Sequence, residues 1–241
     1  MKIIIAKNKE EFDRIAADIV SQQLKDKPDS VLGLATGSTP LGLYAQLVER
    51  YKKGEIDFSK VKTFNLDEYK GLAKTHPQSY YFFMFKHLFS KVNIDPENIH
   101  IPNGEVEDSA KESEEYEKKI KAAGGIDLQI LGIGHNGHIG FNEPGTPFES
   151  TTSLIDLDQR TIEANSRFFD SIDEVPRQAI SMGIKTIMQA RKIVLMISGK
   201  DKAEIAAKAI KGPVTTQVPA SVLQLHPFAT VLLDQEAASL L

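Results

Sequence analysis

Short apolar runs alternate with longer segments of helical periodicity along the 241 residues of this chain. This alternation is typical of a mostly parallel sheet covered by helices, because a crossover between parallel strands needs room for a helix. The six runs that predict strands are Lys2–Ala6, Val31–Ala35, Val61–Leu66, Ile126–Ile133, Ile193–Ser198 and Ala229–Leu233. The sequence therefore predicts an α/β fold with a mostly parallel sheet flanked by helices.

Between these runs, apolar residues recur at the three- and four-residue spacing of an amphipathic helix. The segments concerned are Lys9–Leu24, Leu41–Tyr51, Ser109–Ala123 and Lys200–Lys211. Asp108 or Ser109 can begin the third of these helices, and Gly124-Gly125 can end it.

Residues 1–241 contain no internal repeat, low-complexity tract or linker, which favours a single domain. The least regular stretch covers about residues 146–182, where polarity is mixed and no strong period appears. It has two interpretations, a lid-like segment over a site or ordinary peripheral structure, and the sequence leaves both open.

The composition excludes several classes of protein. A net charge of −4 gives no basic field for nucleic acid or for an anionic membrane. No stretch approaches 18 uninterrupted apolar residues, and the opening run is too short for a signal peptide. The absence of cysteine excludes disulfides and favours a reducing cytoplasm. We expect a cytoplasmic protein with a small-molecule partner; the sequence does not distinguish a monomer from a homo-oligomer.

Four of the predicted strands end in segments with unusual chemistry. These segments are Thr36–Pro40, Asp67–Tyr69, Gly134–Pro144 and Gly199–Lys202. Ligands of open parallel sheets bind outside the carboxyl ends of the strands. If the strands are parallel, all four segments meet at one edge.

The segment Thr36–Pro40 resembles a phosphate-binding turn. Gly37 permits a tight turn, Ser38 and Thr39 offer hydroxyl donors, and Pro40 suits the first position of a helix capped by Thr39. Free amides at the start of that helix would then face an anion. A plain capped turn is the alternative interpretation. Arg167 and Lys202 could neutralise a phosphate, although each alone is more often a solvated surface charge.

Asp67 and Glu68 are adjacent acids at a predicted strand end. Successive strand side chains point to opposite faces, so we expect only one of them to serve a site. A carboxylate there suits abstraction of a proton next to a carbonyl or imine. A surface acid pair is the alternative.

The glycine-rich segment His135–Pro144 carries two histidines, two asparagines and one glutamate. His135 and His138 could indicate a metal, but their spacing with a single nearby glutamate matches no strong zinc pattern. A histidine oriented by a carboxylate fits the segment better, because imidazole both takes and gives a proton near neutral pH. A structural loop with satisfied polar groups is the alternative.

At these residues the whole chain resembles the glucosamine-6-phosphate deaminase family. The resemblance depends on Ala35–Pro40, Phe64–Tyr69, Gly132–Pro144, Asn165–Asp170 and Leu223–Pro227. The strings Asn-Leu-Asp-Glu-Tyr and Gly-His-Ile-Gly-Phe-Asn-Glu-Pro, in this order, are highly specific. The resemblance implies a modified Rossmann-like fold and hydrolytic conversion of glucosamine 6-phosphate into fructose 6-phosphate and ammonia, in amino-sugar catabolism, with no cofactor and no metal.

The resemblance also implies roles for individual residues. Asp67 looks like the base that removes the C2 proton, and His138 like the acid–base of ring opening, oriented by Glu143. Many members have aspartate where this chain has Asn136, which carries no charge and can only hydrogen-bond. The positions that match the family's phosphate contacts are Gly37, Ser38, Thr39, Arg167 and Lys202.

Regulated members of that family carry basic residues after the Asn-Glu-Pro motif and have a longer C-terminus. Here residues 148–156 contain no lysine or arginine, and the chain ends at Leu241. We therefore expect no allosteric activation by N-acetylglucosamine 6-phosphate.

Two other functions are alternatives to the deamination of glucosamine 6-phosphate. 6-Phosphogluconolactonase shares a related fold but needs no C2 base, and a sugar-phosphate sensor of a transcription regulator would need a DNA-binding segment.

Overall fold

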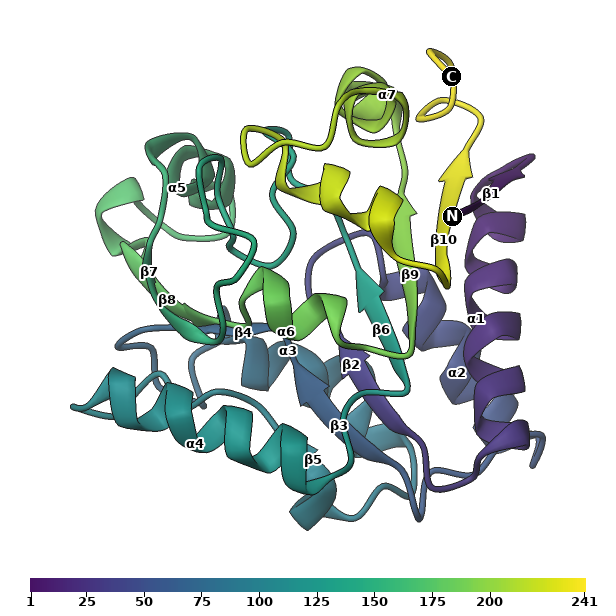
Figure 1. Cartoon of the computed structure of the whole chain (residues 1–241). Helices are drawn as coiled ribbons and strands as arrows, with labels where there is room; N and C mark the ends of the chain where they lie inside the picture. The colour runs from purple at the N-terminus through teal and green to yellow at the C-terminus, as the bar shows by residue number, and fades with distance from the viewer.

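Seven parallel strands form the central sheet of the computed structural model, which describes residues 1–241 except the side chain of Ala164 (Figure 1). The strand order is β1-β10-β9-β6-β2-β3-β5. The strands are β1 Lys2–Ala6, β2 Val31–Leu34, β3 Lys62–Asn65, β5 Ile99–His100, β6 Leu128–Leu131, β9 Lys192–Ile197 and β10 Ala229–Asp234. All six predicted strands are present, with ends that differ by at most two residues, and their pairing is parallel as expected.

The four predicted helices also form. They are α1 Lys9–Asp26, α2 Leu41–Lys52, α4 Ser109–Ala122 and α7 Ala203–Lys211. Asp108 caps α4 by accepting a hydrogen bond from the amide of Lys111, and Gly124 and Gly125 adopt the left-handed conformation beyond its end. The expected start of α7 at Lys200 is wrong, because Lys200–Lys202 is a separate 3-10 turn, η4.

The expected cap of α2 is also wrong. Pro40 occupies the cap position of this helix, and α2 begins at Leu41. The left-handed Gly37, with φ 97°, tightens the turn, and the amide of Leu41 donates to the carbonyl of Ser38. Thr39 therefore lies inside the turn rather than at the cap.

Several elements had no clear signal in the sequence. The helices among them are α3 Tyr80–His87, α5 Gln159–Ser166 and α6 Ile184–Met188. The 3-10 turns are η1 Phe89–Lys91, η2 Pro96–Asn98, η3 Ile172–Glu174 and η5 Pro219–Leu225. Helices on both faces give the sheet three layers, with α1, α2 and α3 against one face and α4, α6 and α7 against the other (Figure 1).

The two apolar cores follow from the alternation of side chains along each strand. On β6, Leu128 and Ile130 belong to the core under α1 and α2, whereas Leu131 belongs to the core under α4, α6 and α7. Strands that are buried on both faces are therefore apolar almost throughout, which is why their sequences are recognisable.

A second, antiparallel sheet of three strands, in the order β4-β8-β7, lies beside the carboxyl end of β3. Its strands are β4 Asp67–Tyr69, β7 Ser153–Asp156 and β8 Gln178–Ser181. The chain passes from β3 into β4 through Leu66, whose amide donates to Leu34 and whose carbonyl accepts from Met182. Asp67–Tyr69 thus forms a strand of this second sheet.

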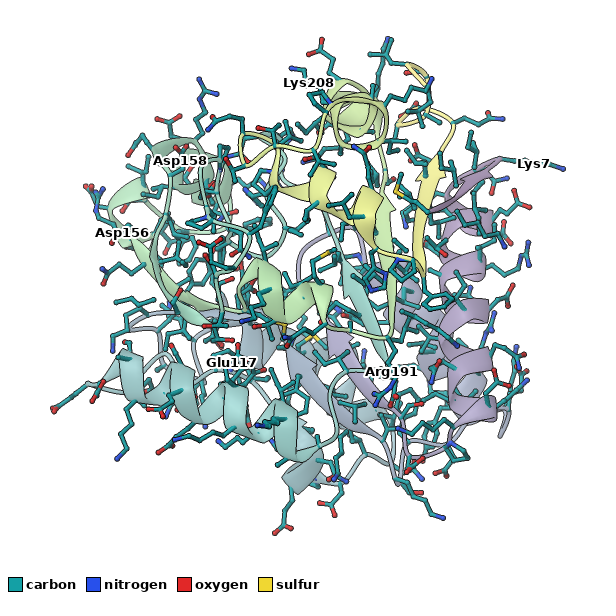
Figure 2. All side chains as sticks on the ribbon, in the orientation of Figure 1. Lys7, Glu117, Asp156, Asp158, Arg191 and Lys208 are labelled. Carbon is teal, nitrogen blue, oxygen red and sulfur yellow. The ribbon has the colours of Figure 1, made fainter. Side chains whose placement is uncertain are left out.

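The irregular stretch 146–182 contains β7, α5, η3 and β8. It is attached to the main body just before its first strand, where Glu117 of α4 accepts hydrogen bonds from the amide and the hydroxyl of Thr152 (Figure 2). Glu117 also accepts from the hydroxyl of Thr186 in α6. A small aromatic and aliphatic core, which includes Tyr69 and Phe141, packs beneath it. Among the described residues, no helix combines the length and apolar character needed to cross a membrane.

Candidate active site

A cavity of about 560 Å³ opens at the carboxyl ends of the central strands. All four unusual segments contribute to its wall, through Thr36–Thr39, Asp67 and Tyr69, Gly132–His138, and Asp201 and Lys202. Asp67 and His138, which are 71 positions apart in the chain, thus line one cavity. The parallel sheet brings the segments together as the sequence predicted.

Asp67 is the first residue of β4, and only 6% of its surface is exposed. Burial, together with the neighbouring charge of Glu68, raises the pKa of its carboxyl group to about 8. A carboxylate in this environment is a stronger base than one in water, because its charged form is poorly solvated.

Glu68 has a different environment although it is the next residue. Its carboxylate accepts hydrogen bonds from the backbone amides of Tyr69, Tyr80 and Tyr81 at 2.8 to 2.9 Å. Two of these amides belong to the first turn of α3, so Glu68 holds the start of that helix. Burial raises the pKa of Glu68 to about 7, although these hydrogen bonds oppose the rise. Asp67 lines the cavity, in agreement with the expectation that one acid of the pair faces a site.

His138 lies in the cavity wall with Glu143 beside it. The Nδ1 atom of His138 is 3.1 Å from Oε2 of Glu143, and Nδ2 of Asn136 donates to the same oxygen at 2.6 Å. Oδ1 of Asn136 in turn accepts from the backbone amide of His138 at 3.2 Å. The ring also lies close over Gly134, where a Cβ atom would come within 2.2 Å of it. The loop therefore holds the imidazole on two sides.

Glu143 remains ionised in this arrangement. Burial alone would raise its pKa, but hydrogen bonds from His138, Thr161 and Asn136, together with the charge of His138, lower the pKa to about 2. A permanent carboxylate on Nδ1 leaves Nε2 of His138 as the nitrogen that exchanges a proton with a ligand.

His135 does not share the environment of His138. It is exposed, and its Nε2 atom is 2.7 Å from Oδ2 of Asp201. Among the residues that the structure describes, no group of three or more metal-ligating side chains is gathered at one point.

Another part of the cavity wall is cationic. Arg167, at the carboxyl end of α5, and Lys202, at the end of η4, both line the cavity together with Gly37, Ser38 and Thr39. Burial lowers the pKa of Lys202 to about 8; the charge of Asp201 opposes this effect, and the charge of Arg167 adds to it. The Nζ atom of Lys202 donates to the carbonyl of Ile133 at 3.0 Å. An anion beside these two cations would relieve their repulsion.

Two residues of this region were missed by sequence reasoning. The hydroxyl of Thr161 donates to Oε1 of Glu143 at 2.6 Å, and Thr161 lines the cavity. Asn165 donates to the hydroxyl of Tyr69 at 2.9 Å. Both lie on α5, which follows Asp158; the side chain of Asp158 caps the helix by accepting from the amide of Arg160 (Figure 2).

The fold and the cavity define a Rossmann-like α/β enzyme whose site combines a buried base, a histidine–carboxylate pair and a cationic anchor. Residues 7–232 match the family described as glucosamine-6-phosphate isomerases/6-phosphogluconolactonase, and the chain belongs to this family. The family membership and the fold expected from the sequence are thereby confirmed.

Among its relatives, the glucosamine-6-phosphate deaminase of Thermoanaerobacter pseudethanolicus is 60% identical over 241 residues, which is all of this chain and 95% of that protein. The glucosamine-6-phosphate deaminase of Clostridium novyi is 57% identical over 99% of both chains. A solved structure described as a monomeric glucosamine-6-phosphate deaminase is 47% identical over the full length of both chains, with a TM-score of 0.98. The 6-phosphogluconolactonase of Thermotoga maritima shares the fold, with a TM-score of 0.76 and 22% identity over 97% of this chain and 98% of that one.

The burial of Asp67 predicts a pH dependence of stability. Because its pKa is raised in the folded protein, the fold keeps a proton between about pH 4 and pH 8 that the unfolded chain has lost. Its contribution to stability therefore falls as the pH rises through this window. Asp67→Asn lacks this titration, so its free energy of unfolding relative to the wild type should rise by at least about 1 kcal/mol between pH 5 and pH 8.5, since one pKa unit corresponds to about 1.4 kcal/mol. Urea unfolding at both pH values measures the change.

The matched control for this experiment is Asp29→Asn, which alters an exposed carboxylate. It should follow the wild-type pH dependence. Parallel curves for Asp67→Asn and the wild type would mean that Asp67 is solvated.

The cationic part of the cavity wall, formed by Arg167 and Lys202, predicts that two nearby lysines contribute differently to phosphate binding. Lys202→Ala should weaken the binding of fructose 6-phosphate roughly tenfold or more, because a charge-assisted hydrogen bond contributes about 1.5–3 kcal/mol. Lys200→Ala, on the same turn but exposed, should change the dissociation constant less than about twofold. Titration calorimetry compares the two variants, and equal affinities would place the phosphate elsewhere.

Proposed function

We propose that this protein deaminates glucosamine 6-phosphate, giving fructose 6-phosphate and ammonia, in amino-sugar catabolism. The observation that carries the proposal is that a desolvated carboxylate, Asp67, and a histidine–carboxylate pair, His138 and Glu143, lie at one cavity with Lys202 and Arg167. The relatives that are 56–60% identical over nearly the whole chain bear the name of this activity.

In this proposal the phosphate of the substrate is bound by residues that take no part in the proton transfers. The turn Gly37–Thr39 supplies amides and hydroxyls, and Lys202 and Arg167 supply charge. Binding a group that does not react orients the sugar against the reacting side chains, which lowers the entropic cost of each proton transfer.

Ring opening is assigned to His138. The C2 proton of a closed pyranose is not acidic, so the anomeric hydroxyl must lose its proton and the ring oxygen must gain one before the aldehyde appears. Nε2 of His138 can move that proton while Glu143 holds Nδ1 and stabilises the imidazolium form. Asn136 hydrogen-bonds both partners of the pair and carries no proton in this scheme.

Asp67 is assigned the next step, removal of the C2 proton from the open-chain aldehyde. The product of this step is an enol-amine, and return of a proton to C1 gives an imine at C2. Water adds to the imine, the C–N bond breaks, and the ketose and ammonia leave. A general base of this kind contributes roughly 10²–10⁴-fold to the rate, and an ammonium group at C2 beside Asp67 would favour its ionised form.

Lactone hydrolysis is the principal alternative, because the family includes 6-phosphogluconolactonases. Hydrolysis of a lactone needs an activated water and a polarised carbonyl, but it needs no base at C2. A buried carboxylate placed to remove a C2 proton, the role proposed for Asp67, is therefore not required by that reaction. The lactonases of known structure are 17–22% identical to this chain and thus share only its fold.

We further propose that the enzyme acts in the cytoplasm and as a monomer. A single chain supplies each group assigned to the reaction, and the 47% identical structure is described as monomeric. The cytoplasmic setting rests on the absence of cysteine from the sequence.

A coupled assay tests the proposed function. The purified protein should release ammonia and fructose 6-phosphate in equal amounts from glucosamine 6-phosphate and should not accelerate the hydrolysis of 6-phosphogluconolactone above its rate without enzyme. Added N-acetylglucosamine 6-phosphate should not steepen or shift the rate curve, as residues 148–156 carry no lysine or arginine. Lactone hydrolysis without ammonia release would reverse the assignment.

A second experiment isolates the role of Asp67. Asp67→Asn should bind fructose 6-phosphate with near-normal affinity. The rate at which the C2 hydrogen of glucosamine 6-phosphate exchanges with solvent deuterium should fall by roughly 10²-fold or more in this variant. Nuclear magnetic resonance of the sugar follows the exchange. Near-normal exchange would exclude Asp67 as the base.

A further inference from the structure

The carboxylate of Glu143 is held from two directions. His138 and Asn136 donate to Oε2, and both belong to the same loop as Glu143. The hydroxyl of Thr161 donates to Oε1 at 2.6 Å from a different part of the chain, 18 positions further on. The terminal torsion angle of a glutamate side chain has a broad, nearly two-fold distribution. Hydrogen bonds to one carboxylate oxygen alone therefore leave the orientation of the carboxylate plane poorly defined. A donor on the second oxygen fixes that plane.

Thr161 is well placed to fix the plane of the Glu143 carboxylate. Its relative exposure is 7%, so its hydroxyl has little access to competing water. It lies in the first turn of α5, whose start is fixed by Asp158 at the cap. The side chain of a threonine is also stiff at χ1, which limits the positions its hydroxyl can take.

The helix that carries Thr161 also leads into the cationic part of the cavity wall. Asn165 binds the hydroxyl of Tyr69, and Arg167 follows the last turn of α5 and lines the cationic region. One short helix thus contacts the acid–base pair at its first turn and the anion-binding region at its end. The position of α5 and the orientation of Glu143 are mechanically linked through a single hydrogen bond.

We propose that Thr161 is a positioning residue that couples α5 to the His138–Glu143 pair, so that the helix that meets the phosphate also sets the geometry of ring opening. The proposal deepens the proposed function and rests on it for the reaction concerned. Thr161 touches neither the sugar nor a reacting atom in this scheme. It acts through Glu143.

Substitution of Thr161 tests this coupling by kinetics. Thr161→Val removes the hydroxyl at nearly constant shape and should lower kcat about tenfold, the equivalent of one hydrogen bond, with KM changed less than about twofold. Thr161→Ser keeps a hydroxyl and should recover most of kcat. Gln159→Ala, which removes an exposed side-chain hydrogen bond from the same helix, is the control and should behave as the wild type. A kcat of Thr161→Val within twofold of the wild-type value would overturn the proposal.

A double-mutant cycle distinguishes positioning from a general structural role. If Thr161 acts through Glu143, Thr161→Val should cost less than about twofold in kcat when it is added to Glu143→Gln. A full tenfold further loss in that background would mean that Thr161 acts by another route.

A third readout does not depend on activity. In protein with ¹³C-labelled glutamate side chains, the resonance assigned by its loss in Glu143→Gln should titrate at higher pH in Thr161→Val, because one of the bonds that lower the pKa of Glu143 is gone. Thr161→Ser should restore the titration, and an unchanged midpoint in Thr161→Val would overturn the proposal. If the wild type released no ammonia, the proposed function would fail, while this measurement would still decide whether Thr161 holds Glu143.

Discussion

The parallel alignment of the central strands is the constraint on which the site depends. Only because β2, β3, β6 and β9 run the same way do their carboxyl ends lie at one edge, where the turn after β2, β4, the loop after β6 and η4 enclose a single cavity. A reversed strand would carry its segment to the opposite edge. The chemistry of this chain is therefore assembled by topology, from segments that contribute one or two groups each.

Burial and hydrogen bonding give three carboxylates of the site three different characters. Asp67 is desolvated, which raises its pKa to about 8 and suits it to the proposed role of base. Glu68 uses its oxygens on backbone amides of α3 and is structural. Glu143 accepts from three side chains, and its pKa falls to about 2, so it stays charged and supports an imidazolium. The division follows from environment, because the side chains are nearly the same.

The antiparallel sheet gives the stretch 146–182 a role that its sequence does not reveal. Pairing of β8 with β4 joins this stretch to the strand that begins with Asp67, and α5 joins it to Glu143 and to the cationic region. A lid-like role for this stretch stays one of the two predictions made from its sequence. Glu117 of α4 holds this stretch just before β7, and Thr161 of α5 binds Glu143.

The sequence by itself determined that the sheet is mostly parallel, where its six main strands lie along the chain and which segments line the site. Strands buried on both faces must be continuously apolar, and close loops need glycine, so both leave local signals. Only the tertiary structure decided which of Asp67 and Glu68 faces the cavity, that Pro40 and not Thr39 occupies the cap of α2, and that Thr161 meets Glu143. Such facts depend on contacts between distant segments, and a contact made by one hydroxyl leaves no periodic trace in the sequence.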